Sequence, residues 1–356
     1  MPVVAEQYSF VVGVDTHART HTYAIVEAVT GRLVDLRQFP VNAAGIGRAV
    51  AWIDRETSGG VLAAVEGVSS YGAGLVAALD AADIAVVEAK PPRSPMRDGR
   101  DKSDGHDAQA AARNILGREI EKLPRPRSGK LRSALRVLLA ARRSMDTQRT
   151  AARNTLTALL RVIDLGIDVR KPLTDQQVSI IASWRSRPTD DIEQSTARSE
   201  ATRLAREVLL LTVRLEENRD ALEGHVTELA PALLQQRGIG PITAAVFLTA
   251  YSHPGRVRSE AAFAALAGAS PLQASSGNTT RHRLNRSGDR QLNRALDIVA
   301  RVRIAKDPET RAYRDRRLAE GKSTREIRRQ LKRYIARQIY RELTATMTTS
   351  AAAHLQ

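Results

Sequence analysis

The sequence predicts an α/β amino-terminal domain followed by all-α regions. In roughly the first 125 residues, short runs rich in valine, isoleucine and alanine alternate with helical stretches, which is typical of a sheet covered by helices. Farther along, leucines and alanines recur at helical spacing, and the last third combines helical patterns with a glycine turn. We therefore expect an α/β domain at 8–125, a long helical or coiled-coil region at 126–230 and a helical domain at 231–345.

The first domain begins with three predicted strands, which the turn residues Thr30 and Gly31 help to separate. Three strands followed by alternating helices and strands indicate a mixed sheet covered by helices. This order matches the ribonuclease H-like fold, including its RuvC-like branch. The predicted elements are strands at 9–15, 21–27 and 33–39, a helix at 43–55, a strand at 61–67, a helix at 71–82, a strand at 84–90 and a helix at 103–116.

Two long helices are predicted in the middle region, at 131–163 and 196–229. They could form a helical hairpin or a coiled coil, with a role in packing or dimerisation. The stretch between them carries Pro172 and Pro188 and little periodicity, so we expect it to link or cap the long helices. Their arginines could hold nucleic acid or could simply form a solvated face.

The last region contains a Gly238-Ile239-Gly240 turn between helical stretches. It resembles a helix-hairpin-helix element, whose backbone amides can hold a phosphate; an ordinary tight helix connection is the alternative. From residue 301 to residue 343 there are 15 lysines and arginines against 6 acidic residues, and an apolar stripe recurs at helical spacing. Such a helix can pack its stripe inward and lay its basic charge along a nucleic-acid backbone.

The composition favours a nucleic-acid partner. The formal net charge of this 356-residue chain is +16, and neutralisation of phosphates drives the binding of such proteins to polyanions. No run reaches the roughly 18 apolar residues of a spanning helix, and the first residues lack a secretory signal, so we expect a cytoplasmic protein without a membrane partner. The absence of cysteine excludes disulfides, thiolate zinc sites and cysteine nucleophiles.

Four acidic residues stand at the ends of predicted elements. Asp15 and Glu66 each follow an apolar strand, and Asp104 and Asp107 share one face at the start of a helix. Clustered carboxylates repel one another, so such a group usually persists because divalent cations neutralise it. We therefore predict a Mg²⁺ site. Helix capping by Asp104 and a simple turn role for Glu66 are the alternatives.

A polar loop near residue 276 is followed by a series of cations. Ser275, Ser276 and Gly277 open the loop, and a serine hydroxyl among guanidinium groups could attack a phosphodiester. From the residues alone, a phosphate-binding loop is the preferred interpretation. The predicted nucleic-acid-binding residues are Arg281, Arg283, Arg286, Arg290, Gly238 and Gly240.

Six segments of the chain, taken together, resemble the DEDD-type insertion-sequence transposases of family one-ten, some of which are guided by a bridge RNA. The resemblance implies a RuvC-like domain whose acidic tetrad is Asp15, Glu66, Asp104 and Asp107. It also implies a carboxy-terminal transposase domain whose essential serine is Ser276, with Ser275 as its neighbour. The segments are GVDTHARTHTYAIVEA, VEGVSSYGAGLVAAL, KSDGHDAQAAAR, RGIGPITAA, SEAAFAALAGASPLQASSGNTTRHRLNRSGDRQLNRAL and DPETRAYRDRRLAEGKS.

The resemblance implies a DNA transposase or recombinase that cuts and rejoins strands through a covalent 5′-phosphoserine link, with Mg²⁺ held by the acids. Its expected partners are donor and target DNA, a guide RNA and further copies of the chain, as a dimer or tetramer. A structure-specific nuclease similar to a Holliday-junction resolvase is the alternative. A third hypothesis is a basic nucleic-acid scaffold with a decayed site.

Overall fold

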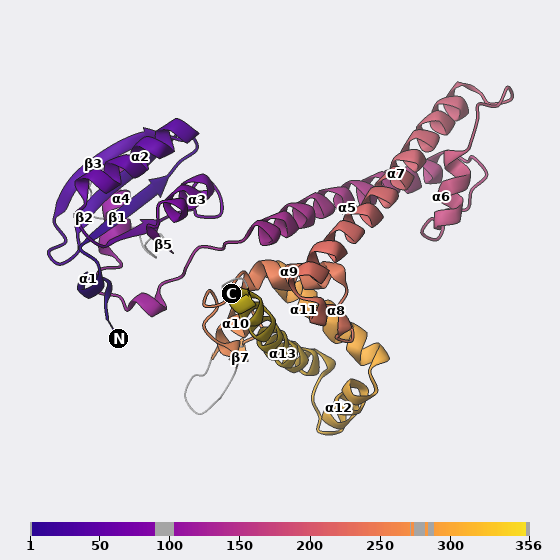
Figure 1. The fold of residues 1–356 in the computed structure, drawn as a ribbon. Coiled ribbons are helices and arrows are strands. Elements are labelled where there is room, and N and C mark those ends of the chain that lie inside the picture. The colour runs from indigo at the N-terminus through magenta and orange to yellow at the C-terminus, as the bar shows by residue number, and fades with distance from the viewer. Residues whose placement is uncertain (1, 90–102, 271, 274–281, 284–287, 354–356) are drawn as a thin grey trace. The chain divides into compact units, whose positions relative to one another are not determined.

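The computed structural model describes residues 2–89, 103–270, 272–273, 282–283 and 288–353. The chain divides into two compact units, Met1–Ser128 and Gly129–Gln356 (Figure 1). The second unit begins at Gly129. It therefore contains most of the helical region expected at 126–230 and all of the domain expected at 231–345. In the described residues, no helix is long and apolar enough to cross a membrane.

The first unit is built on a five-stranded mixed sheet, which confirms the predicted α/β class. The strand order is β3-β2-β1-β4-β5, with β1, β2 and β3 antiparallel and β4 and β5 parallel to β1. This arrangement fits the expected ribonuclease H-like domain. The strands are β1 Phe10–Thr16, β2 Thr20–Glu27, β3 Leu33–Pro40, β4 Val61–Val65 and β5 Ala85–Glu88.

Helices cover both faces of this sheet, so the central strands are buried on both sides. Val11 and Leu62 pack with residues of α4 on one face, whereas Val12 and Ala63 pack with α2 and α3 on the other. This explains why β1 and β4 read as continuous apolar runs rather than as alternating sequences. The helices of this unit are α1 Val4–Gln7, α2 Ala43–Glu56, α3 Ala73–Ala81 and α4 Asp104–Arg113, with a 3₁₀ turn at Ile120–Lys122.

Helix α4 approaches β1 unusually closely at Gly13. A Cβ atom at this position would overlap the carbonyl oxygen of Ala108 and lie 2.7 Å from the nitrogen of Ala112. Alanines on α4 and a glycine on β1 therefore bring the two backbones together. Because α4 begins at Asp104, this contact fixes the first turn of α4 beside the end of β1.

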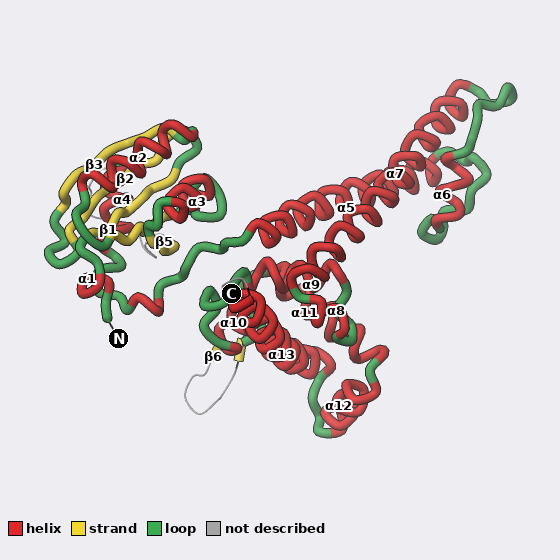
Figure 2. The backbone as a smooth tube through the Cα atoms, in the orientation of Figure 1, coloured by secondary structure: helices red, strands yellow, loops and turns green. Residues whose placement is uncertain are grey.

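The second unit begins with two long antiparallel helices, which confirms the predicted helical pair (Figure 2). They are α5 Lys130–Val162 and α7 Ile192–Leu229. Arg142 donates to the carbonyl of Leu215 at 2.7 Å, and Asn218 donates to the carbonyl of Leu138 at 3.1 Å. The segment between them contains a helix that was not predicted, α6 Asp175–Ala182, which packs against α7 around Val178 and Ile181.

The remaining helices pack around a second hydrophobic core of this unit, beside one end of the α5–α7 pair. Its largest side chains are Phe247, Tyr251 and Phe263, and the predicted stripe of Ile327, Leu331, Ile335 and Ile339 is buried here. The elements are α8 Pro231–Gln235, α9 Pro241–Tyr251, α10 Glu260–Leu266, β6 Leu272–Gln273, β7 His282–Arg283, α11 Arg290–Lys306, α12 Pro308–Ala319 and α13 Thr324–Ala353.

Candidate active site

Asp15 and Glu66 lie side by side at the ends of two parallel strands. Val14 pairs with Val65 in the ladder, and the Glu66 amide donates to the Val14 carbonyl at 3.0 Å, so the two acids follow in register. The Thr16 hydroxyl donates to the Glu66 carbonyl at 3.0 Å. Side chains alternate along a strand, which places Asp15 on the same face as Val11 and Gly13, under α4.

Asp104 and Asp107 lie in the first turn of α4. The N-cap is Ser103, whose hydroxyl accepts a hydrogen bond from the amide of His106 at 3.4 Å. The alternative in which Asp104 merely caps the helix is therefore wrong. Negative charge is stabilised in this turn because the amide groups and the helix dipole point toward it. The helix thus offers two carboxylates at low electrostatic cost.

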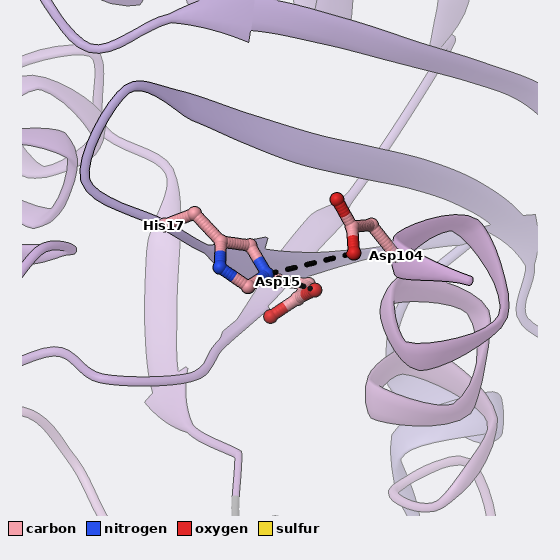
Figure 3. Close-up of side chains that lie close together, drawn as sticks. All are labelled: Asp15, His17 and Asp104. Atoms are coloured by element: carbon pink, nitrogen blue, oxygen red, sulfur yellow. Dashed lines mark hydrogen bonds and ion pairs between the residues drawn. The ribbon is translucent and has the colours of Figure 1, made fainter. Parts of the chain in front are cut away.

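A histidine joins Asp15 to Asp104 (Figure 3). The Nε2 atom of His17 lies 3.0 Å from Oδ2 of Asp15 and 3.6 Å from Oδ1 of Asp104. One ligand atom from each of the three residues lies within 4.8 Å of the others, a spacing that suits a single cation. The Asp15 side chain is 10% exposed, whereas those of His17 and Asp104 are about half exposed, so the cluster opens to solvent on one side.

Glu66 is electrostatically coupled to two of the other acids. Burial raises the pKa of its carboxyl group above the ordinary value, and the negative charges of Asp15 and Asp107 raise it further. The coupling connects the strand-end acids to the helix acids. In the structure, Asp15 and Asp104 meet around His17, Glu66 follows in register beside Asp15, and Asp107 lies in the same turn of α4 as Asp104.

The donor set fits a divalent cation. Carboxylate oxygens are the ligands that Mg²⁺, Ca²⁺ and Mn²⁺ prefer, and an imidazole nitrogen suits the transition metals among the divalent ions. Burial is the main cause of the raised pKa of Glu66, and repulsion from the negative charges of Asp15 and Asp107 adds to it. Bound between Asp15 and Asp104, a cation would relieve that repulsion.

The sequence prediction did not include His17. The signal was available, since the sequence reads Asp15-Thr16-His17, and His17, directly after the strand, continues the alternation that places every second side chain on one face. His21, by contrast, belongs to the opposite face with Tyr23. Burial lowers the pKa of His21, and the charge of Asp15 opposes that effect.

In the sequence, the predicted serine loop falls between β6 and β7. Leu272 pairs with Arg283 and Gln273 with His282 in a short antiparallel ladder. Arg290 is exposed at the first position of α11, after the N-cap Asp289. The predicted site residues Ser276, Arg281 and Arg286, together with Ser275 and Gly277, lie outside the described residues.

The predicted glycine turn connects α8 to α9. Gly238 adopts a φ of +82°, which glycine tolerates best, and packs against Val299 and Arg303 of α11. The amide of Gly240 donates to the hydroxyl of Thr243 at 3.0 Å, at the start of α9. The buried side chain of Ile239 anchors the turn in the core.

Arginines and tyrosines, most of them exposed, line a depression between α12 and α13, which we call the α12–α13 groove. Arg316 lies over the ring of Tyr313, and the Tyr313 and Tyr334 rings meet edge to face. Among the described residues, no ion pair is found for Arg316 or Arg333. The groove is lined by Tyr313, Arg316, Arg317, Arg333, Tyr334 and Arg337, together with Glu320 and Gln330.

Two protein-family models match the chain. Residues 12–164, which include all four acids, match a model of the DEDD transposases of IS110 described as "Transposase". Residues 230–315, which include the glycine turn and Ser276, match the model described as "Transposase IS116/IS110/IS902 family".

Two curated proteins are also similar to the chain. The "Insertion element IS110 uncharacterized 43.6 kDa protein" of Streptomyces coelicolor is 34% identical over 116 residues, which cover 31% of this chain and 29% of that protein. The "Insertion element IS900 uncharacterized 42 kDa protein" of Mycobacterium paratuberculosis is 30% identical over 199 residues, which cover 54% of this chain and 48% of that protein. The matched segments thus span less than half of either relative. Two models of this family match successive parts of the chain, residues 12–164 and 230–315. The chain therefore belongs to the IS110 family of insertion-sequence transposases.

Proposed function

We propose that this protein is a DNA transposase of an insertion sequence, which cuts and rejoins DNA strands with the help of divalent metal ions. The observation that carries the proposal is the meeting of Asp15 and Asp104 around His17, with Glu66 in register beside Asp15 and Asp107 in the same helical turn as Asp104. Family membership supports DNA as the substrate, and the net charge of +16 suits a polyanionic partner.

The four acids have distinct positions in the proposed site. Asp15 and Glu66 are fixed by the β1–β4 ladder, and Asp104 and Asp107 by the first turn of α4. A divalent ion held by these oxygens, with Mg²⁺ as the expected ion, would stabilise negative charge on the phosphate and ease deprotonation of the attacking hydroxyl. The low exposure of Asp15 keeps one carboxylate in a fixed orientation.

We assign the nucleophile to Ser276, following the family resemblance. Its hydroxyl would lose a proton and attack phosphorus, the 3′-oxygen would leave, and the 5′-phosphate would remain esterified to the serine. Attack by another 3′-hydroxyl would then release the serine and rejoin the strands. Because the phosphoserine ester conserves the bond energy, no nucleoside triphosphate is needed.

Donor DNA, target DNA, a guide RNA and further copies of the chain are the proposed partners. In the groove between α12 and α13, Arg316 and Arg333 make no ion pair with any residue that the structure describes, and with the exposed Tyr334 they are suited to a nucleic-acid backbone. The long helices carry exposed apolar side chains, among them Leu210 and Val213, each about half exposed, which favours coiled-coil packing between copies. A discrete RNA that co-purifies with the protein, encoded beside its own gene, would support guidance; only random fragments would contradict it.

The nucleophile is tested by incubating the full-length protein with element-end DNA and Mg²⁺ and then denaturing the mixture. The proposal predicts a protein-linked 5′ DNA end that is lost in Ser276→Ala and retained in the matched control Ser275→Ala. Loss in Ser275→Ala alone would move the assignment by one residue. Asp15→Asn is expected to abolish both the adduct and strand cleavage. If Asp15→Asn left every activity unchanged, a nucleic-acid scaffold would replace the transposase.

A structure-specific nuclease is the second candidate, because the acid cluster lies entirely within the first unit. In that mechanism the acids would activate water and the serine loop would only bind phosphate. The same gel distinguishes the two functions. Free 5′ ends produced equally by wild type and Ser276→Ala would support hydrolysis and contradict the serine mechanism.

A further inference from the structure

His17 lies inside the proposed metal site, although it is not one of the four acids. Its Nε2 atom is 3.0 Å from Asp15 Oδ2 and 3.6 Å from Asp104 Oδ1, so the nitrogen lies where these two carboxylates converge (Figure 3). The three side chains come from the end of β1, from the turn that follows it and from the first turn of α4. A cation that contacted both carboxylates would therefore also meet this nitrogen.

The backbone at His17 is held by the end of the β1–β2 hairpin. Thr16 pairs with His21 at the end of the β1–β2 ladder, and the amide of His17 donates to the carbonyl of Thr20 at 3.3 Å. His17 thus opens a tight hairpin turn and stays on the face occupied by Asp15. These contacts hold the backbone of His17, and the 3.0 Å contact between Nε2 and Oδ2 of Asp15 orients the imidazole.

A nitrogen ligand changes which ion such a site prefers. Sites made of oxygen ligands suit Mg²⁺ and Ca²⁺, whereas imidazole suits transition metals, and Mn²⁺ accepts both kinds of ligand. A neutral imidazole coordinates through the unprotonated nitrogen. If His17 acted only as a counter-ion of Asp15, a bound metal would displace it and the coordination shell would contain oxygen alone.

We propose that His17 is a metal ligand, which binds through Nε2 the same ion as Asp15 and Asp104, and that it raises the affinity of the site for Mn²⁺ relative to Mg²⁺. The inference rests on the proposed function, since the ion is the one that the four acids would hold. The four acids remain the main determinants of binding, and His17 determines selectivity among divalent ions.

The test is pulsed electron paramagnetic resonance of Mn²⁺ bound to the full-length protein. The wild-type complex is expected to show a coupling between the manganese electron spin and a directly bound ¹⁴N nucleus. The coupling should change to that of ¹⁵N when the histidines are labelled with ¹⁵N, without any substitution. It should disappear in His17→Gln and persist in the matched control His106→Gln, whose histidine lies in the first turn of α4 and contacts Ser103.

Binding titrations provide a second readout that does not depend on catalysis. His17→Gln is expected to weaken Mn²⁺ binding by about tenfold or more, a scale typical of changes at metal sites, and to weaken Mg²⁺ binding less. Because the His17 side chain is about half exposed, the variant is expected to fold, which circular dichroism checks.

The possible results separate the two proposals. Mn²⁺ binding that requires Asp15 and Asp104 but shows no nitrogen coupling would overturn the role of His17 and leave the four-acid site intact. Equal losses of Mn²⁺ and Mg²⁺ affinity in His17→Gln would overturn the selectivity. Failure of the wild-type protein to bind Mn²⁺ at all would overturn the proposed metal-dependent function, and the His17 inference with it.

Discussion

Gly13 of β1 lies directly against the carbonyl of Ala108 in α4, with no room for a Cβ atom between them. This contact sets the distance between the sheet and the helix that carries Asp104 and Asp107. Two residues beyond Gly13, Asp15 points to the same face of the strand. The glycine therefore controls whether the acids of the helix reach those of the strands.

The first prediction concerns Gly13→Val. The added side chain must push α4 away from β1, so we expect a loss of unfolding free energy of about 1–3 kcal/mol or more and weaker Mn²⁺ binding. Chemical denaturation and metal titration measure the two effects. Gly47→Ala is the control, because this exposed glycine of α2 has no atom within 4 Å of a Cβ position. It should stabilise the helix by about 0.5–1 kcal/mol. An unchanged metal affinity in Gly13→Val would contradict this role of Gly13.

The second prediction concerns the charge of Glu66. Burial, followed by the charges of Asp15 and Asp107, raises the pKa of this carboxyl group. A carboxyl group with a raised folded-state pKa contributes stability that is fully present below its unfolded-state pKa and is lost as the pH rises through the raised value. In the presence of a chelator, Glu66→Gln should therefore unfold at a higher temperature than wild type at neutral pH, and the difference should shrink toward pH 4.

Thermal unfolding from pH 4 to pH 8 measures this effect. With added Mn²⁺, the wild type should unfold at a higher temperature than Glu66→Gln, because metal binding stabilises the wild type more than a variant in which one carboxylate is missing. Glu121→Gln removes an exposed glutamate of the same unit and serves as the control. A Glu66→Gln protein that was less stable than wild type at neutral pH without metal would contradict a raised pKa of this carboxyl group.

A third prediction concerns the ion pair between Arg198 and Asp190, at the far end of the helical pair. Both side chains are about 5% exposed, and Arg198 also stacks on Trp184 at 5.0 Å. Arg198→Ala leaves Asp190 without its partner and removes the stacking interaction, so it should lower the unfolding temperature clearly. Arg203→Ala removes an exposed arginine paired with Glu200 and should have little effect. If the two variants lowered the unfolding temperature equally, burial would not be what makes the Arg198–Asp190 ion pair important.

The fourth prediction concerns the α12–α13 groove. Arg316→Ala combined with Arg333→Ala should weaken DNA binding and reduce the slope of log affinity against log salt by about 0.9 for each phosphate that the variant no longer neutralises. Fluorescence anisotropy at several salt concentrations measures both quantities. The matched control removes Arg170 and Arg203, which are paired with Asp168 and Glu200. If the control variant bound DNA as weakly as the groove variant, only the overall charge would matter.

Much of the first unit could be predicted because its signals are local. Apolar strands and helical periodicity determined the order of the elements, and the position of Asp15 and Glu66 after parallel strands predicted that they would meet. The proximity of Asp104 and Asp107 could be predicted because they are three residues apart within one turn of a helix. The mixed sheet, the long helical pair and the apolar stripe of α13 were predicted for the same reason.

Other features depend on contacts between segments distant in sequence. The glycine at position 13 is explained only by the approach of Ala108, almost a hundred residues away. Helix α6 was missed because it is short and lies between two prolines, and its burial comes from packing against α7. His17 could have been predicted from strand alternation, but its contact with Asp104 required the position of α4.

The most direct test of the four-acid site is anomalous diffraction from crystals of the full-length protein soaked in Mn²⁺. We expect a manganese peak within coordination distance of Asp15 and Asp104, with oxygen ligands from Glu66 or Asp107 in the same site. Absence of a peak beside Asp15, at a Mn²⁺ concentration that saturates binding in solution, would contradict a metal site formed by these acids.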